Sequence, residues 1–349
     1  MKRVLLAMSS NYFVTGGAGF IGSNYVHRLL KRGEKVTVYD NLSRAGAARN
    51  LAWLRSEYGQ DSFALVQADI RDAEMVRQAS VDADIFVHLA GQVAVTTSVV
   101  DPQDDFEINA LGTFNVLEAA RLNGRNPVFL YSSTNKVYGG MEDVNVVERN
   151  GRWEYENLPN GASENQPLDF HSPYGCSKGT GDQYVRDYHR IYGLRSVVLR
   201  QSCIYGPRQF GVEDQGWVAW MIIAAVTGKN ISIYGDGKQI RDLLHVYDLN
   251  DAYDAAIAKI DEVQGQIFNL GGGPANTMSI WHEFGPKLEK LLGHNIPVTY
   301  GDWRPGDQKV FVADIRKAKQ HLGWEPKYSV DAGVSQLFGW VKDNTALFK

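Results

Sequence analysis

Short apolar runs rich in β-branched residues alternate with amphipathic stretches through the first 200 residues of the chain. The apolar runs predict strands at residues 11–16, 35–40, 62–68, 84–90, 127–133 and 194–200. The amphipathic stretches predict helices, among them residues 20–33, 105–124 and 174–193. Strands that alternate with helices form right-handed crossovers, which build a parallel sheet covered by helices on both faces. The pattern therefore predicts an α/β fold with a doubly wound parallel sheet.

The pattern changes beyond residue 200, where short strands mix with helices and Gly/Pro turns. Three of these strands are expected at residues 231–235, 266–272 and 296–301. We expect a smaller, interwoven α/β domain here, which binds the substrate. The expected domain bounds are 1–200 with about 240–270 for the larger domain, and about 201–239 with 271–349 for the smaller one.

A long polar insertion at about residues 139–171 separates the fifth predicted strand from the helix at 174–193. Loops of this length in a compact domain are usually functional lids or disordered segments. We favour a lid or a pocket wall.

Composition narrows the class of protein. The net charge is −4, so the chain has no overall positive potential that would attract nucleic acid or an anionic membrane. Two cysteines cannot form a disulfide framework, and the longest apolar helix candidate, residues 217–226, is about half as long as a bilayer span requires. The first ten residues carry two cations and a short apolar run without a convincing cleavage site. We expect a cytoplasmic protein without a metal site.

The segment "VTGGAGFIG" leaves the first predicted strand and enters the first helix. Gly17, Gly19 and Gly22 fit the pattern G-x-G-x-x-G, and Gly16, Gly19 and Gly22 fit a looser version. Such glycines permit a tight turn and let backbone N–H groups and a helix N-terminus approach a pyrophosphate. With a strand before and a helix after, the motif predicts a Rossmann-type dinucleotide site.

Asp40 ends the second predicted strand, 18 residues after the last glycine of this motif. Its carboxylate would accept hydrogen bonds from the adenosine ribose and repel a 2′-phosphate, which favours NAD over NADP. Arg44 offers a cation for a 2′-phosphate, although we expect it to be an exposed surface residue. The expected cofactor-binding residues are Gly16, Gly19, Phe20, Ile21, Gly22, Asp40, Asn41, Asp69, Ile70, Leu89, Ala90, Gln92, Tyr174 and Lys178.

Tyr174 and Lys178 lie four residues apart, just after Pro173. This spacing also suits an ordinary exposed pair at a helix start. However, Thr134 follows the fifth predicted strand, and parallel strands deliver their carboxyl ends to the cofactor cleft. Lys178 and a positive nicotinamide would lower the pKa of the phenol from about 10. The phenolate can then take a proton from a substrate hydroxyl, while hydride leaves the same carbon for NAD⁺. Thr134 would hold that hydroxyl in place, and Lys178 would also anchor the nicotinamide ribose.

The chain resembles the extended short-chain dehydrogenase/reductase superfamily, specifically its nucleotide-sugar members. The resemblance runs from about residue 11 to the C-terminus. It rests on "TGGAGFIG", "YDNLSR", "HLAGQVAVTTS", "SST…VYG", "YGCSK", "YGPRQ", "GDGKQIRDLLHV" and "RPGDQKVFVAD". The resemblance implies that bound NAD⁺ oxidises a sugar carbon transiently, after which the keto sugar is epimerised, dehydrated or reduced.

The residues after Thr134 distinguish these outcomes. Related 4,6-dehydratases carry Asp-Glu or a close variant there, whereas this chain has Asn135 and Lys136. An amide is neither acid nor base at ordinary pH, so dehydration is disfavoured. Proton-shuffling 3,5-epimerases need a base such as a thiol, and we expect Cys176 and Cys203 to be buried and unreactive.

Four segments, "YSSTNKVYG", "LDFHSPYGCSKG", "GPRQF…DQGW" and "GKQIRDLLH", are most similar to 2-epimerase members of the superfamily. This similarity implies a CDP-sugar as partner, a CDP-linked 3,6-dideoxyhexose (CDP-paratose or CDP-tyvelose), with oxidation at C2 and hydride return to the opposite face. The alternatives are a 2- or 4-epimerase of another CDP-, GDP- or UDP-hexose, a net dehydrogenase or reductase, and a non-catalytic NAD sensor.

The diphosphate of such a substrate needs local cations in this net acidic chain. The resemblance implies this role for Arg241 and Arg304, and Arg208 is a third candidate; surface ion pairs are the alternative for each. Tyr234 is expected either to stack on the nucleobase or to lie in the core. The expected substrate-binding residues are Thr134, Asn135, Arg208, Gln209, Gln215, Tyr234, Arg241 and Arg304, with Asp214 as a further hydrogen-bonding candidate.

Three further polar positions, Gln92, Thr96 and Thr97, follow the fourth predicted strand and are candidates to line the sugar. His88 lies on an apolar strand and is interpreted as a core histidine. His171, beside the Tyr174 turn, makes either a loop hydrogen bond or a sugar contact.

By analogy with the superfamily we expect a homodimer formed by helices at about 102–123 and 174–192. The second helix carries a stripe of Tyr184, Val185, Tyr188 and Ile191. Ordinary core packing is the alternative for this stripe.

Overall fold

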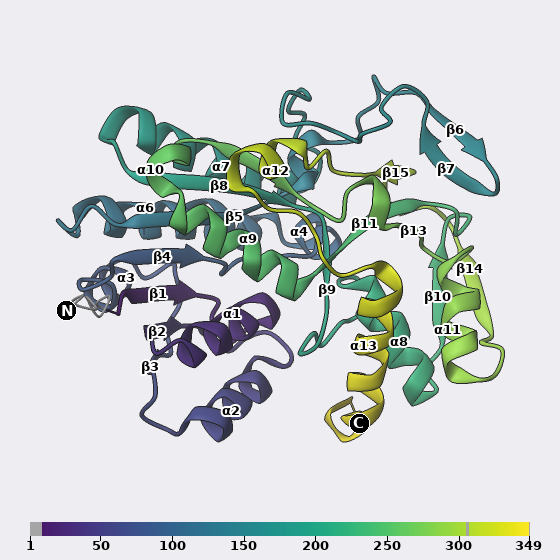
Figure 1. Ribbon diagram of the computed structural model, residues 1–349, viewed down its shortest axis with the longest axis horizontal. Coiled ribbons are helices and arrows are strands. Elements are labelled where there is room, and N and C mark those ends of the chain that lie inside the picture. The colour runs from purple at the N-terminus through teal and green to yellow at the C-terminus, as the bar shows by residue number, and fades with distance from the viewer. Residues whose placement is uncertain (1–8, 305–306, 349) are drawn as a thin grey trace, which may run out of the picture.

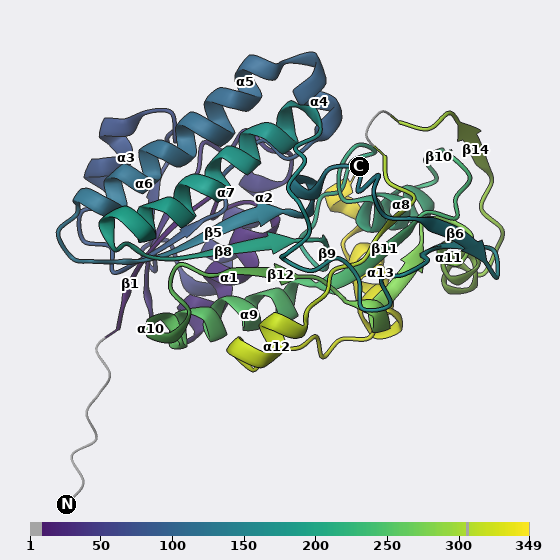
Figure 2. The same cartoon turned by 90° about the horizontal axis from the view of Figure 1, so that it is seen from above.

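The computed structural model describes residues 9–304 and 307–348. In this part of the chain, the largest sheet has seven parallel strands in the order β12-β8-β5-β4-β1-β2-β3 (Figures 1 and 2). These strands are β1 (Asn11–Thr15), β2 (Lys35–Tyr39), β3 (Ala64–Val66), β4 (Ile85–His88), β5 (Val128–Thr134), β8 (Arg195–Gln201) and β12 (Ile267–Leu270). The predicted doubly wound parallel sheet is confirmed.

Helices cover both faces of this sheet, as Figure 2 shows from above. One face carries α3 (Ala73–Ala79), α4 (Val95–Val100), α5 (Pro102–Phe106), α6 (Gly112–Leu122) and α7 (Ser172–Tyr192). The other face carries α1 (Phe20–Lys31), α2 (Ala47–Tyr58), α9 (Val246–Ala258), α10 (Ile260–Val263) and α12 (Arg316–Leu322). Strands covered on both faces can be apolar along their whole length, and all four residues of β4 are buried.

The helix predicted at residues 105–124 is interrupted. A π-helical turn, η1 (Glu107–Leu111), separates α5 from α6. Such turns insert one extra residue into a helix and occur often at functional sites. Here the turn holds Asn109 against the loop after β4, where its amide donates to the Gln92 carbonyl at 3.0 Å. Amphipathic periodicity does not reveal an insertion of this kind.

The second half of the chain builds its own apolar core around α8 (Trp217–Thr227), α11 (Phe284–Leu292) and α13 (Val330–Asp343). Its short strands are β9 (Cys203–Tyr205), β10 (Ile231–Tyr234), β11 (Ile240–His245), β13 (Thr277–Ser279), β14 (Val298–Gly301) and β15 (Val310–Phe311). The described residues also form three 3₁₀ turns, namely η2 (Asn135–Tyr138), η3 (Pro274–Asn276) and η4 (Thr345–Phe348). Because β11 pairs with β9, β13 and β15 while β12 joins the large sheet, the two halves interweave. The domain bounds remain a prediction.

The insertion at residues 139–171 forms an antiparallel hairpin, β6 (Val146–Arg149) with β7 (Arg152–Tyr155). Tyr155 is buried in an apolar cluster with Met141 and Phe311. The Tyr155 hydroxyl also donates to the Val310 carbonyl at 3.1 Å. The hairpin is thus anchored to the small sheet. Two cavities lie at the carboxyl ends of the parallel strands, and none of residues 139–171 lines them. The expected pocket-wall role is not supported.

Among the described residues, no helix is long and apolar enough to cross a membrane. Within the same residues, no group of His, Cys, Asp or Glu side chains is arranged to hold a metal ion. The expectation of two buried thiols is wrong for Cys176, which is exposed, while Cys203 is half-buried. Cys176 follows Tyr174 by two positions, and this spacing places it on another face of α7.

Candidate functional site

Two adjoining cavities lie at the carboxyl ends of the parallel strands. The glycine-loop cavity, of about 390 Å³, contains Gly16, Gly19 and Gly22 in its wall. The Thr134 cavity, of about 400 Å³, contains Thr134 and Tyr174. Six residues line both cavities: Phe20, Ile21, Val93, Ser132, Gln209 and Gln215. A ligand in one cavity therefore borders a ligand in the other, as a transfer reaction between cofactor and substrate requires.

The glycine loop fits a dinucleotide pyrophosphate. Gly16 has φ of +68°, and a Cβ there would lie 2.8 Å from the Ala90 nitrogen. A Cβ on Gly22 would lie 2.1 Å from the Gly16 oxygen, so only glycine permits this close turn. Gly19 caps α1 without a side-chain hydrogen bond, which leaves the first N–H groups of the helix to a ligand. Such N–H groups and the helix dipole favour a phosphate.

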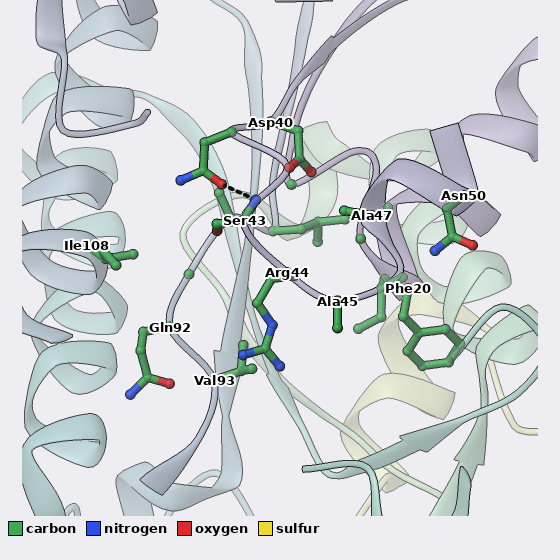
Figure 3. Close-up of a pocket in the computed structure, with 18 of the residues that line it drawn as sticks. Phe20, Asp40, Ser43, Arg44, Ala45, Ala47, Asn50, Gln92, Val93 and Ile108 are labelled. Atoms are coloured by element: carbon green, nitrogen blue, oxygen red, sulfur yellow. Dashed lines mark hydrogen bonds between the residues drawn. The ribbon is translucent and has the colours of Figure 1, made fainter. Parts of the chain in front are cut away.

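Asp40 follows β2 and closes one end of the glycine-loop cavity (Figure 3). Its Oδ2 accepts the Ala18 N–H at 3.0 Å and its Oδ1 accepts the Leu42 N–H at 2.8 Å. Burial raises the pKa of this carboxyl, and the backbone N–H bonds oppose that rise. Each carboxylate oxygen can accept more than one hydrogen bond. The two oxygens are thereby held in place and can still receive ribose hydroxyls.

The glycine-loop cavity gathers nearly all the residues predicted to bind the cofactor. These are Gly16, Gly19, Phe20, Ile21, Gly22, Asp40, Asn41, Asp69, Ile70, Leu89, Ala90 and Gln92. Tyr174 lines only the neighbouring cavity, and Lys178 lines neither. Their binding roles remain predictions.

Arg44 differs from the plain surface arginine that we expected. Although exposed, its side chain points into the glycine-loop cavity between Asp40 and Val93 (Figure 3). Its guanidinium donates to Oε1 of Gln215, which lies in the second half of the chain. Arg44 therefore bridges the two halves across the cavity.

Tyr174 and Lys178 occupy the first two turns of α7 and are buried. Lys178 Nζ donates to the Ser132 carbonyl at 2.6 Å, so the ammonium lies at the wall shared by the cavities. The Thr134 hydroxyl lies near enough to the Tyr174 phenol to lower its pKa, and both side chains line the Thr134 cavity. The structure thus brings the three predicted catalytic residues together at the end of β5.

The protonation of these groups differs from the expectation. Burial raises the pKa of Tyr174 to about 12. The nearby Thr134 hydroxyl lowers this pKa and so opposes the rise only in part. Burial also lowers the pKa of Lys178 to about 8, so the amine is still mostly charged at pH 7. Burial of the phenol therefore opposes the lowering of its pKa that was expected from Lys178 and a positive nicotinamide.

Several residues that the sequence analysis did not assign hold α7 in place. The Tyr174 N–H donates to Oγ of Ser98 at 3.1 Å, so the end of α4 caps α7. Ser177 Oγ donates to Asp105 at 2.5 Å, and Asn109 Nδ2 donates to Asp105 at 3.1 Å. These contacts join segments up to 76 residues apart, and no local sequence pattern encodes them.

A buried ion pair lies beneath the same strand end. Arg200 Nε and Nη2 each donate to a carboxylate oxygen of Asp182 at 2.9 Å. The two side chains are 2% and 0% exposed. Ser133 Oγ donates to the same carboxylate at 2.7 Å. The pair therefore connects the residue before Thr134 to α7, one turn beyond Lys178.

The Thr134 cavity gathers most residues predicted to bind the substrate. These are Thr134, Asn135, Gln209, Gln215, Tyr234, Arg241 and Arg304. Arg208 lines the glycine-loop cavity instead. Its backbone has φ of +70°, and its guanidinium lies 4.1 Å from the centre of the Trp53 ring. This placement does not support substrate binding by Arg208.

The two remaining arginines carry acidic partners. Arg241, 8% exposed, pairs with Asp307 at 3.3 Å. Arg304 pairs with Asp214 at 3.3 Å, and its guanidinium lies 3.7 Å from the centre of the Tyr234 ring. Tyr234 thus lies at the cavity and not in the core. A guanidinium on an aromatic face is attracted by the ring, so this pair is preformed.

Other candidates divide between the two cavities. Thr96 lines the Thr134 cavity, while Thr97 and Gln92 line the glycine-loop cavity. His88 is a buried core histidine as expected, hydrogen-bonded to Thr15 at 2.7 Å. His171 makes a loop hydrogen bond with Asp169 at 2.9 Å, and it lines neither cavity.

The Thr134 cavity also includes residues that the sequence analysis did not place there. Lys136 lies beside Asn135, and Trp217, Trp220 and Met221 lie on one face of α8. The spacing of these three α8 residues, i, i+3 and i+4, was a signal for a shared helix face. It does not show whether that face meets a core or a cavity.

Comparison with known proteins agrees with this geometry. The family described as "NAD dependent epimerase/dehydratase family" matches residues 12–271. A CDP-paratose 2-epimerase from Salmonella typhi is 45% identical over 334 residues, which cover 94% of this chain and 98% of that protein. A structure of UDP-glucose 4-epimerase with UDP-glucose from Thermotoga maritima has a TM-score of 0.82 and 31% identity, and the match covers 96% of this chain and 99% of that one. A structure of dTDP-glucose 4,6-dehydratase from Streptomyces venezuelae with NAD bound has a TM-score of 0.83 and 28% identity, covering 96% and 98%.

Proposed function

The chain belongs to the NAD-dependent epimerase/dehydratase family, and on that basis we propose that it inverts C2 of a CDP-linked 3,6-dideoxyhexose. The substrate pair is CDP-paratose and CDP-tyvelose, interconverted through a 2-keto sugar. The observation that carries this proposal is the position of Tyr174 and Thr134 in one cavity, with the Lys178 ammonium at the wall shared with the glycine-loop cavity. The similarity to the Salmonella typhi 2-epimerase supports the choice of sugar and carbon.

Bound NAD supplies the hydride acceptor for oxidation at C2 and the hydride donor for the following reduction. Tyr174 as phenolate takes the proton of the C2 hydroxyl and returns it to the new hydroxyl. Thr134, which lines the same cavity as the phenol, holds the substrate oxygen within reach. Lys178, whose ammonium donates to the Ser132 carbonyl, contributes positive charge behind the wall that the two cavities share.

The two positions directly after Thr134 carry no carboxylic acid for a dehydration. Eliminating water from the keto sugar needs an acid for the leaving hydroxyl and a base for a carbon-bound proton. The positions after Thr134 carry the amide of Asn135 and the amine of Lys136, and both line the cavity. Burial raises the pKa of the Cys203 thiol, the cysteine in this wall, so it is a poor base near neutral pH.

The test is to incubate the purified protein with CDP-paratose in deuterated water without added NAD, and to follow the sugar by proton NMR. We expect CDP-tyvelose with no deuterium at C2, because hydride returns within the closed site. Tyr174→Phe, which removes the phenol and little else, should lose at least about 10²-fold in kcat. Deuterium at C2 would show proton exchange in place of hydride return.

Other nucleotide sugars separate the remaining alternatives. If CDP-paratose is unchanged while UDP-glucose is converted at C4, the 2-epimerase assignment is wrong and a 4-epimerase is correct. Stoichiometric accumulation of NADH would indicate a net dehydrogenase, since an epimerase regenerates its cofactor.

We also propose that two copies pair through the outer face of α5, α6 and α7. Apolar side chains are exposed on this face, including Phe106, Phe114, Tyr184 and Ile191. The stripe expected on α7 is divided, because Val185 is buried against the sheet while Tyr184 is exposed. Phe114 and Tyr184 contact each other edge-on at 6.2 Å between ring centres.

Analytical ultracentrifugation tests this pairing. We expect a dimer for the unchanged protein and a monomer for Phe114→Asp, because a charge would be buried in the apolar contact. Tyr300→Asp, at an exposed position of β14 in the second half of the chain, is the matched control and should leave the dimer intact. A monomer at all concentrations would overturn the proposal.

A further inference from the structure

A 3,6-dideoxyhexose keeps two secondary hydroxyls, at C2 and C4, so a 2-epimerase must choose between them. C2 is bonded to the anomeric carbon that carries the diphosphate, whereas C4 lies across the ring. When C2 is beside the Tyr174 phenol, the sugar-proximal phosphate lies on the same side of the sugar as the reacting carbon. When C4 is there, the ring separates that phosphate from the phenol. A cation close to Tyr174 therefore favours the first orientation and gives little to the second.

Lys136 is placed for this role. It belongs to η2, two residues beyond Thr134, and its N–H donates to Oγ1 of Thr134 at 3.2 Å. A Cβ on Gly175 would lie 3.3 Å from the Lys136 carbonyl, so this residue also abuts the turn that carries Tyr174. Lys136 lines the Thr134 cavity together with Thr134 and Tyr174. Its position is thus fixed relative to the reacting hydroxyl by backbone contacts.

The charges around Lys136 favour an anion. Arg241 and Asp307 lie close enough to shift its pKa in opposite directions, and both line the same cavity. Lys136 and Arg241 thus share the one carboxylate of Asp307, whereas Arg304 is accompanied by Glu213 and Asp214 in the same lining, so any excess of positive charge is local to Lys136 and Arg241. Burial lowers the pKa of Lys136 to about 8, so the amine is mostly protonated at pH 7. A bound phosphate would stabilise that charge further.

We propose that Lys136 is the positioning residue that selects C2 over C4, because its ammonium binds the sugar-proximal phosphate beside Tyr174. This inference rests on the proposed function, since it explains how that reaction chooses its carbon. Arg304, which pairs with Asp214 and lies on the Tyr234 ring, holds the diphosphate more generally and does not determine which hydroxyl reaches the phenol. At this position the related dehydratases carry an acid–base residue. In this chain Lys136 carries instead a charge that determines how the sugar is oriented.

The test compares Lys136→Met, Lys136→Arg and Arg304→Met with the unchanged protein, each as the NAD-loaded enzyme. CDP-paratose is the substrate, and NMR resolves its C2 epimer from its C4 epimer. For Lys136→Met we expect the rate of C2 inversion to fall about tenfold or more, with the C4 epimer appearing as a new product. Lys136→Arg keeps the charge and should form only the C2 epimer. Arg304→Met should raise KM without forming the C4 epimer.

Folding and the proposed function are controlled separately. Lys136 does not line the glycine-loop cavity, so every variant should retain NAD to the same extent, measured after denaturation. If the unchanged protein inverts C2 while Lys136→Met shows the same KM and no C4 epimer, only the selection by Lys136 is wrong. If the unchanged protein fails to invert C2, the proposed function and this inference fall together. Equal loss of C2 turnover in Lys136→Met and Lys136→Arg, with NAD retained, also overturns the role of charge.

Discussion

The ion pair of Asp182 with Arg200 gives a prediction whose size follows from its burial. Asp182→Asn removes the negative charge but keeps the shape, so the Arg200 guanidinium stays buried beside a neutral amide. In the protein both oxygens of Asp182 accept from Arg200, and neither side chain is more than 2% exposed. Removing one partner of such a pair costs about 3–5 kcal/mol, since the remaining charge is uncompensated. That is a large share of the ~5–15 kcal/mol that stabilises a typical fold.

The assay is equilibrium unfolding in urea, read from tryptophan fluorescence. Glu325→Gln is the matched control, because it removes a carboxylate from an exposed pair with Lys319 and should cost less than about 1 kcal/mol. Adding Arg200→Met to Asp182→Asn should recover part of the loss, since it removes the orphaned cation. A loss for Asp182→Asn no larger than that of Glu325→Gln would refute the reasoning from burial. No recovery in the double variant would show that the cost does not come from the orphaned charge.

Three further changes test separate parts of the structure. Asp40→Ala should weaken NAD about tenfold or more and reduce the preference over NADP, measured as the ratio of the two Kd values. Gly22→Ala would bring a Cβ to 2.1 Å from the Gly16 oxygen and should abolish NAD retention, whereas Gly339→Ala, in open space on α13, should retain it. His88 has its pKa lowered to about 3 by burial, so below pH 6.5 the unfolded chain binds a proton that the folded protein does not. Stability should therefore fall by about 2 kcal/mol from this group between pH 7 and pH 5, and urea unfolding of His88→Asn should lack that component.

The elements that position the cofactor cavity could be predicted because their signals are local. The glycine turn needs small residues at fixed spacing, and Asp40 follows the next strand directly. Strand ends in a parallel sheet meet at one edge, so the position of Thr134 near Tyr174 followed from the alternation of strands and helices. In each case a short stretch of sequence and one topological rule were sufficient.

The parts that could not be predicted depend on partners distant in sequence or on one backbone angle. Ser98 caps the helix of Tyr174 across 76 residues, and Asp105 receives Ser177 across 72. Serines and buried acids of this kind carry no periodic signal. Arg208 was expected at the substrate because of its charge, but a left-handed backbone turns it onto Trp53. A positive backbone φ is uncommon for arginine, and the amino-acid composition does not indicate where one occurs.

The protonation of Tyr174 shows why a motif does not determine its own chemistry. The Tyr-x-x-x-Lys spacing predicts a cation beside a phenol, and both groups are present at the end of β5. Yet burial raises the pKa of Tyr174 to about 12 and lowers that of Lys178 to about 8, so the same enclosure disfavours both charges. Burial is the largest cause of the raised pKa of Tyr174, and Thr134 opposes it only in part. Positive charge that enters the shared wall of the two cavities would favour the phenolate, so under the proposed function an oxidised cofactor promotes proton removal by Tyr174.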